Sequence, residues 1–170
     1  MDEFLDFYSK IYDREVQRSK TLNDGINMPV TIIGLFIGLM YYIFQNLKNI
    51  QCTKRDIIDI GFGLSFILIG IAVVYLALSF NRIFKGYKYP DLPKTTALLK
   101  YHKELIKYNS DSKTNDKKSF SEYLIGQFAG YSDEYAAVND LRAGYLFRAR
   151  KYIVATLFVQ LITMICYLFL

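Results

Sequence analysis

Few side chains in this sequence have the types and the spacing that catalysis or metal binding requires. His102 is the only histidine, and its nearest acidic neighbour, Glu104, would lie on another face of a helix. A catalytic site needs a nucleophile beside a base, or several metal ligands within reach of one ion. Small all-α ribonuclease-like domains place an arginine four to six residues before a histidine, but here those positions hold Thr96, Ala97 and Leu98. We therefore expect a surface histidine, no enzymatic activity, no cofactor and no bound metal.

One polar stripe interrupts an otherwise apolar stretch near the C-terminus. Thr156, Gln160 and Thr163 follow one another at i, i+4 and i+7, so a helix would carry them on one face. Two roles stay open for this stripe. The side chains could form hydrogen bonds between helices, or they could line an aqueous path where several copies assemble, since three helices cannot enclose a conduit.

Three segments contain no Asp, Glu, Lys, Arg or His, and they are long enough to cross a bilayer. They cover residues 28–44, 61–80 and 152–170, which is 17, 20 and 19 residues. A transmembrane helix needs about 20 apolar residues. Helices of a soluble bundle would keep a polar face, and these segments have none. The chain begins MDEFLDF, which is acidic where a signal peptide is basic, so the first segment is expected to stay as an anchor.

The distribution of basic residues predicts the orientation in the membrane. The short loop between the first two segments holds only Lys48, Lys54 and Arg55, whereas fourteen of the 21 Lys and Arg residues lie in 81–151. Basic loops stay in the cytoplasm, so the N-terminus and the long loop should face inward, in a bacterial inner membrane, and the C-terminus outward. The net charge of +5 is then explained mostly by the orientation in the membrane, and nucleic-acid binding by the basic loop is the less favoured interpretation. Just before the third segment, the basic side chains would mark the cytoplasmic mouth of an assembly: Arg142, Arg148, Arg150 and Lys151.

The remaining pattern predicts an all-α fold with three spans, a helical cytoplasmic layer and a long C-terminal stalk-plus-span helix. The expected parts are an amphipathic helix in 1–27, with an Asp6–Lys10 pair, two spans with a short outward loop in 28–84, a basic cytoplasmic loop in 85–132 and one long helix in 133–170. Within the loop we expect a helix over 95–108, a mobile linker over 109–118, and a helix opened by a Ser119–Glu122 capping box and closed or kinked by Gly130.

Small residues at four-residue spacing let membrane helices approach closely. Gly34 and Gly38 have this spacing in the first span, and Gly61 and Ser65 in the second, so these four could seat one span on the other. Cys52 and Cys166 would lie near the same membrane face, so a disulfide between them is conceivable, although lone membrane cysteines are usually inert.

Two charged stretches run directly into spans: YDREVQRSKTLNDGINMPV over 12–30 and VNDLRAGYLFRARKY over 138–152. With the order of the parts, this layout resembles small bacterial membrane proteins of antiphage defence, and is most similar to the membrane-pore accessory proteins of type VI-B CRISPR systems. The resemblance implies a homo-oligomeric, pore-like ring in the inner membrane that acts with an RNA-guided ribonuclease and depolarises the membrane after viral RNA is cut. That family was once suspected of ribonuclease activity through an Arg/His motif, which this sequence lacks.

Two hypotheses of function follow. The first is a pore-forming effector whose partners are membrane lipid and further copies of itself. The second is a membrane-tethered adaptor that recruits a soluble defence protein or RNA to the inner face through its basic cytoplasmic helices, with the spans serving only as an anchor. The charge-free spans and the polar stripe favour the pore.

Overall fold

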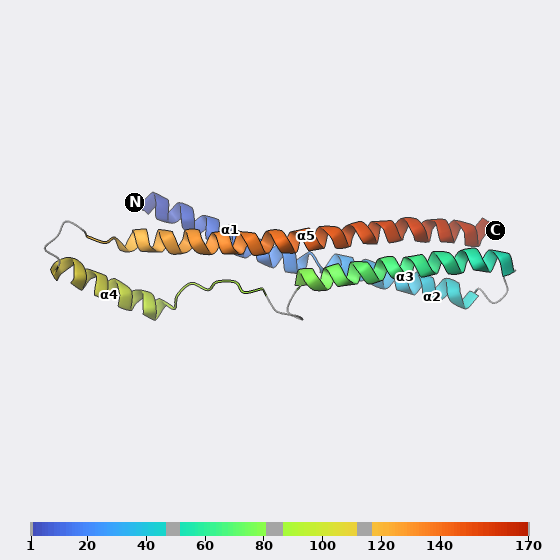
Figure 1. Cartoon of the computed structure of the whole chain (residues 1–170), viewed down its shortest axis with the longest axis horizontal. Helices are drawn as coiled ribbons and strands as arrows, with labels where there is room; N and C mark the ends of the chain where they lie inside the picture. The colour runs from blue at the N-terminus through green and yellow to red at the C-terminus, as the bar shows by residue number, and fades with distance from the viewer. Residues whose placement is uncertain (1, 47–51, 81–86, 112–116, 170) are drawn as a thin grey trace. The chain divides into compact units, whose positions relative to one another are not determined.

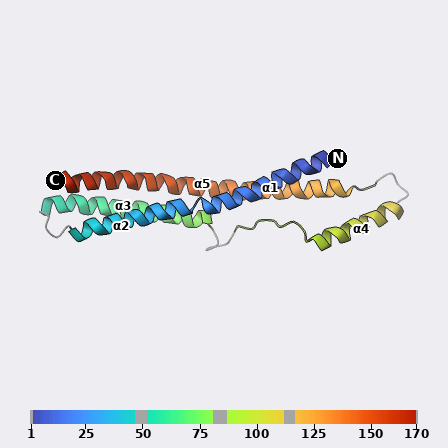
Figure 2. The same ribbon diagram turned by 180° about the vertical axis from the view of Figure 1, so that it is seen from behind.

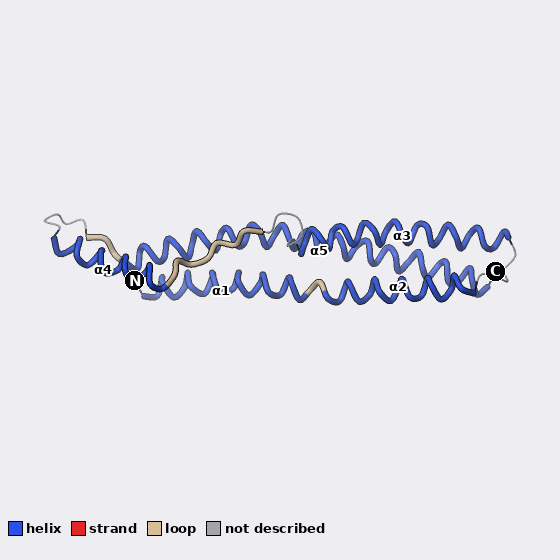
Figure 3. Tube along the Cα trace, turned by 90° about the horizontal axis from the view of Figure 1, so that it is seen from below, coloured by secondary structure: helices blue, strands red, loops and turns tan. Residues whose placement is uncertain are grey.

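The computed structural model describes residues 2–46, 52–80, 87–111 and 117–169. Every regular element in these ranges is a helix (Figure 3), which confirms the all-α fold. The elements are α1 (Asp2–Asp24), α2 (Asn27–Asn46), α3 (Cys52–Phe80), α4 (Thr95–Asp111) and α5 (Phe120–Phe169).

The junction between α1 and α2 is only two residues long. The Gly25 amide donates to the Thr21 carbonyl at 2.9 Å, and the Ile26 amide donates to the Asn23 carbonyl at 3.3 Å, which closes the end of α1. Pro29 lies in the first turn of α2, where a helix does not need the amide hydrogen that proline lacks. The α1 helix and its Asp6–Lys10 ion pair, with Nζ 2.6 Å from Oδ2, are as the sequence predicts.

The α5 helix is longer than the sequence indicates. It contains 50 residues without interruption, which corresponds to about 75 Å. The prediction that the long helix starts only at residue 133 is wrong, and Gly130 does not end a helix, because α5 continues through it. One glycine inside a helix costs only about 1 kcal/mol relative to alanine, which weakens a helix without ending it.

The α4 helix also extends beyond its expected end. It continues to Asp111, and the Asn109 side chain bonds the Lys118 backbone twice, donating to the carbonyl at 2.9 Å and accepting from the amide at 3.1 Å. Both ends of the expected linker are therefore ordered, while residues 112–116 lie outside the described part.

The chain divides into two compact units. The first, called here the α4 unit, comprises Met1–Lys20 and Tyr87–Asp140; the second, called the three-helix unit, comprises Thr21–Gly86 and Leu141–Leu170. Each unit contains segments from both halves of the sequence. The boundaries of the units therefore differ from those of the four consecutive parts expected from the sequence.

In the three-helix unit, α2, α3 and the C-terminal part of α5 run side by side (Figures 1 and 2). Within the described ranges, three helical stretches are long and apolar enough to cross a membrane: Glu3–Gln45, which joins α1 and α2, then Arg55–Phe80 and Phe120–Phe169. Side chains from all three helices form the core, including Phe36, Met40, Ile58, Phe62, Ala149 and Ile153. The exterior is apolar as well, and on α5 it carries large side chains: Leu157, Phe158, Leu161, Ile162, Ile165 and Phe169. An apolar core inside an apolar surface is what a membrane-embedded helical bundle requires.

Candidate functional site

The polar stripe of α5 lies in the interior of the three-helix unit. Thr156, Gln160 and Thr163 are 0%, 5% and 4% exposed. Each threonine hydroxyl donates at 2.8 Å to a carbonyl one turn earlier in its own helix. The Gln160 amide donates to the Phe36 carbonyl of α2 at 3.5 Å. Side chains covered by their own chain cannot line a path between chains, so the pore-lining assignment does not fit this arrangement. Of the alternative role, hydrogen bonds between helices, only the Gln160 contact to α2 is present, while both threonines bond within α5.

Beside this stripe, α3 approaches α5 closely. A methyl group at Gly61 would overlap the Thr163 hydroxyl and would lie 3.1 Å from its Cγ2 atom. Ser65, one turn further along α3, is fully buried. Gly61 and Ser65 are therefore packing residues, as expected, but Gly61 packs on α5 rather than on the first span.

Two buried polar atoms in this region have no hydrogen-bond partner in the described part of the chain. They are the Ser65 hydroxyl oxygen and the Gln160 side-chain carbonyl oxygen. Because the amide contact to Phe36 is also long, Gln160 is held weakly. The polar stripe of α5 therefore adds little to the stability of the three-helix unit.

Gly34 and Gly38 do not pack within the chain. Both are exposed, and a methyl group at either position would meet no atom within 4 Å. The expectation that they seat the first span on the second is wrong. The face of α2 that carries Gly34 and Gly38 points away from the three-helix unit and is exposed.

Of the four basic residues expected at a cytoplasmic mouth, Arg142 is buried. It is 2% exposed. Its Nε atom donates to the Ser79 carbonyl at 2.9 Å, and its guanidinium also donates to the Asn23 side chain. The Ser79 hydroxyl returns a hydrogen bond to the Arg142 carbonyl at 3.1 Å. Arg142 therefore ties α1, α3 and α5 together and cannot belong to an exposed ring of charge.

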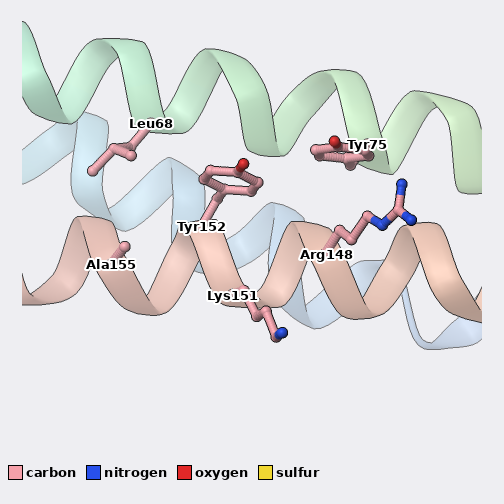
Figure 4. A pocket seen from close by; sticks show the side chains of 6 residues that line it. All are labelled: Leu68, Tyr75, Arg148, Lys151, Tyr152 and Ala155. Carbon is pink, nitrogen blue, oxygen red and sulfur yellow. The ribbon is translucent and has the colours of Figure 1, made fainter.

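The other three basic residues, Arg148, Arg150 and Lys151, are exposed. Two of them border a groove of about 500 Å³ (Figure 4), which is lined by Leu68, Tyr75, Arg148, Lys151, Tyr152 and Ala155. The Arg148 guanidinium lies 5.8 Å from the centre of the Tyr75 ring, which itself stacks on Tyr152 at 5.7 Å. Cationic groups beside tyrosines are typical of the level at which a helix leaves hydrocarbon for the lipid headgroups.

The α4 unit has a buried polar cluster that the sequence did not reveal. Glu15 of α1 is 6% exposed and Asn139 of α5 is fully buried. The Asn139 amide donates to the Glu15 backbone carbonyl at 2.9 Å and to its carboxylate at 3.2 Å, while the Tyr89 hydroxyl donates to Asn139 at 3.0 Å. Arg18 bridges Glu15 at 3.4 Å and Asp140 at 2.5 Å, and the Asp140 contact raises the pKa of Arg18. The cluster thus locks α1 to α5.

Aromatic rings cover this cluster. Tyr135 packs on Tyr12 and on Tyr89, with ring centres 5.6 Å and 4.6 Å apart, and Phe128 lies 5.7 Å from Tyr12. Burial raises the pKa of Tyr135 to about 12, and burial also raises the pKa of Tyr12. The neutral phenols are therefore favoured in the folded state.

This predicts a late step in alkaline titration. Since the folded pKa of Tyr135 lies above the unfolded value of 10.0, its contribution to stability is complete below pH 10 and is lost as the pH rises toward about 12. Tyr135→Phe should remove one group from the late phase of the phenolate absorbance. A titration curve unchanged by Tyr135→Phe would contradict the assignment.

The described residues contain no group of side chains arranged as a catalytic or metal-binding site. In the described ranges, no three His, Cys, Asp or Glu residues are grouped so that they could hold a metal ion. His102 is half-buried, with its ring 4.6 Å from the Phe120 ring. Cys166 is a free thiol, and the Cys52 side chain lies outside the described residues, so the disulfide stays a prediction.

The three long apolar helices and the apolar exterior together define a helical membrane protein. No family model, no curated protein and no solved structure matches this chain.

The interior position of Gln160 predicts the effect of a single substitution. Gln160→Leu should leave the free energy of unfolding within about 0.6 kcal/mol of the parent, or raise it, because it removes one long hydrogen bond and one unpartnered oxygen. Unfolding in detergent micelles measures this, with Gln160→Glu as a destabilising control that buries a charge. A large loss from Gln160→Leu would show that the glutamine does more than fill space.

Proposed function

We propose that this protein is a homo-oligomeric, pore-like membrane effector. The observation that carries the proposal is the face of α2 that points away from the bundle. It carries two open glycines, Gly34 and Gly38, in line with four exposed polar residues, of which Thr31 donates to the Asn27 carbonyl and Gln45 to the Tyr41 hydroxyl within α2. Polar groups facing hydrocarbon are unfavourable, and small residues in a span favour helix contacts. A second protein surface is the natural cover for such a face, and copies of the same chain supply one at every position.

The proposed setting is a bacterial inner membrane, with the N-terminus and the α4 unit in the cytoplasm. The excess of Lys and Arg in the 81–151 segment supports this orientation. The exposed Arg148, Arg150 and Lys151 would then lie at the inner headgroups.

The proposed role is antiviral defence. The resemblance of the 12–30 and 138–152 stretches to the type VI-B CRISPR accessory proteins suggests activation by an RNA-guided ribonuclease, followed by depolarisation and slowed metabolism. The structure adds a physical reason to look at these stretches together, since Glu15 and Asn139, one from each, bond each other.

A membrane-tethered adaptor is the second candidate, and one observation favours it. Phe4 and Phe7 of α1 are 65% and 57% exposed and, with Glu3 and Tyr8, line a shallow groove of the α4 unit. An exposed aromatic groove on a helix is a typical docking surface for a soluble partner. In this alternative the spans serve only as an anchor.

Replacing the spans separates the two functions. In one variant, residues 27–80 and 152–170 are exchanged for unrelated apolar spans, while the α4 unit is kept. In the other variant, Phe4→Ser and Phe7→Ser remove the groove. Membrane potential is followed with a potential-sensitive dye in cells that also contain the activated ribonuclease. The pore predicts depolarisation by the intact protein and by the groove variant, but none after span exchange. Depolarisation that survives span exchange would overturn the pore and support the adaptor.

A further inference from the structure

Two faces of the three-helix unit share a pattern that its packing does not use. On α2, Thr31, Gly38 and Gln45 follow one another seven residues apart, and all three are exposed. On α3, Asp56, Gly63 and Gly70 do the same. A methyl group at Gly38, Gly63 or Gly70 would meet no atom within 4 Å. A seven-residue repeat keeps such positions on one seam along a helix.

Both seams point away from the core. On α2 the buried side chains include Ile33, Phe36, Met40 and Ile43, and on α3 they include Ile58, Phe62, Ser65, Ile69, Ala72 and Leu76. At about 100° per residue, each seam lies on the opposite side of its helix from these positions. The open glycines thus form two lines of small residues on the outside of the bundle, each flanked by large exposed side chains such as Tyr41 on α2 and Phe66 on α3.

The contacts to α5 show that the two seams match in height along the bundle. Gln160 bonds Phe36 of α2, and Thr163 contacts Gly61 of α3. Because α2 runs parallel to α5 and α3 runs antiparallel (Figure 1), the residue of α2 level with Gly61 is Leu39. Because α2 and α3 are antiparallel, each step toward the C-terminus of α2 from Leu39 corresponds to one step toward the N-terminus of α3 from Gly61. This places three pairs of seam residues at the same level along the bundle, within about one residue or about 1.5 Å. The pairs are Gln45 with Asp56, Gly38 with Gly63, and Thr31 with Gly70.

Charge and hydrogen-bonding character also match at one end. Near Gln45 the α2 seam offers the Tyr41 hydroxyl as a donor, which itself accepts the Gln45 amide at 2.5 Å within α2, and both side chains are exposed. At the same level the α3 seam offers the exposed carboxylate of Asp56, which is an acceptor, while the neighbouring Asp59 pairs with Arg55 at 3.7 Å. A donor on one seam therefore faces an acceptor on the other when two copies stand side by side in a membrane.

From this match we infer that the α2 seam of one copy binds the α3 seam of the next copy. The inference rests on the proposed function and names its interface. The contact is heterologous, because two different surfaces meet, and repeated contacts of this kind close into a ring when the rotation between copies allows it. The bulky face of α5 is left for lipid. The occupant is a second copy of this chain, since the two seams match each other in spacing, height and polarity.

Cysteine cross-linking in membranes tests the interface. In a background with Cys52→Ser and Cys166→Ser, Gly38→Cys and Gly63→Cys are introduced singly and together, and the membranes are treated with copper–phenanthroline. The double variant should give a ladder of dimers, trimers and larger products, because every chain links to two neighbours. Each single variant should stay uncross-linked, and two single variants expressed together should give dimers only.

The controls separate other outcomes. Gly38→Cys with Phe158→Cys, on the bulky face of α5, should give no ladder. A dimer from Gly38→Cys alone would show a symmetric contact and would overturn the inference. Gly38→Leu should abolish the oligomer while helix content stays unchanged, and Gly144→Leu, at an equally open glycine of α5, should not. If the protein is an oligomer but the double variant gives no ladder, this interface is wrong while the proposed function stands. If the protein is a monomer, both this interface and the proposed function are contradicted.

Discussion

Gly61→Ala is expected to lower the free energy of unfolding of the three-helix unit by about 1–3 kcal/mol, the usual cost of forcing extra volume into a packed core. The added methyl group would overlap the Thr163 hydroxyl, and rotating that side chain does not help because Cγ2 and Cβ of Thr163 lie at 3.1 Å and 3.2 Å. The helices α3 and α5 must therefore separate. Thermal or denaturant unfolding in detergent, followed by loss of helix signal, measures the effect.

Gly144→Ala is the matched control, since a methyl group there meets no atom within 4 Å. It should be neutral or stabilise by up to about 1 kcal/mol, because alanine favours helix. Shortening the opposing side chain with Thr163→Ala should restore much of the stability that Gly61→Ala removes. Equal stabilities for Gly61→Ala and Gly144→Ala would contradict the close contact between α3 and α5.

The α4 unit should respond most strongly to Asn139→Asp, which is expected to cost about 3–5 kcal/mol, as for an uncompensated buried charge. The substitution keeps the shape of the side chain but replaces the amide that lies 3.2 Å from the Glu15 carboxylate with a second carboxylate. Water is largely excluded from the site, since Asn139 is fully buried. The near-ultraviolet signal of the surrounding tyrosines reports unfolding of this unit.

Two comparisons give this experiment its specificity. Asn139→Ala should cost less, about 1–3 kcal/mol, because it removes hydrogen bonds without adding charge. Ala137→Asp introduces a carboxylate at an exposed position of the same helix and should be nearly neutral. The cost of Asn139→Asp should shrink as the pH falls and one carboxyl becomes protonated. A cost that does not change with pH would argue against the contact with Glu15.

The spans and the helical class could be predicted from the sequence because both depend on local signals. A run of about 20 residues without charge identifies a span whatever surrounds it, and the three expected segments lie in α2, α3 and α5, the last of them as far as Phe169. The helix ends were less certain, because Gly130 and the polar residues after Tyr108 weaken a helix without stopping it.

The direction of each helix face could not be predicted in the same way. In a soluble bundle the polar face is the outer face, whereas in a membrane both the core and the exterior are apolar. The spacing of Thr156, Gln160 and Thr163 therefore showed that they share a face, but not that the face points inward. Gly34 and Gly61 look alike in the sequence for the same reason, although one is open and the other is covered by Thr163.

Contacts between residues that lie far apart in the chain also could not be predicted from one sequence. Glu15 and Asn139 are 124 residues apart, and nothing in their local patterns links them. The sequence did mark both neighbourhoods as charged stretches that run into spans. A buried Arg142 was hidden in the same way, since its partners Ser79 and Asn23 come from other helices.

The central claim is that the protein works as a ring of identical chains, and the mass of the particle in native lipid tests it most directly. The protein is extracted from membranes in lipid nanodiscs, without detergent, and weighed by native mass spectrometry. The account predicts one discrete mass that is an integer multiple, three or more, of the 19.8 kDa chain, and its loss in Gly38→Leu. A particle that contains a single chain would contradict the account.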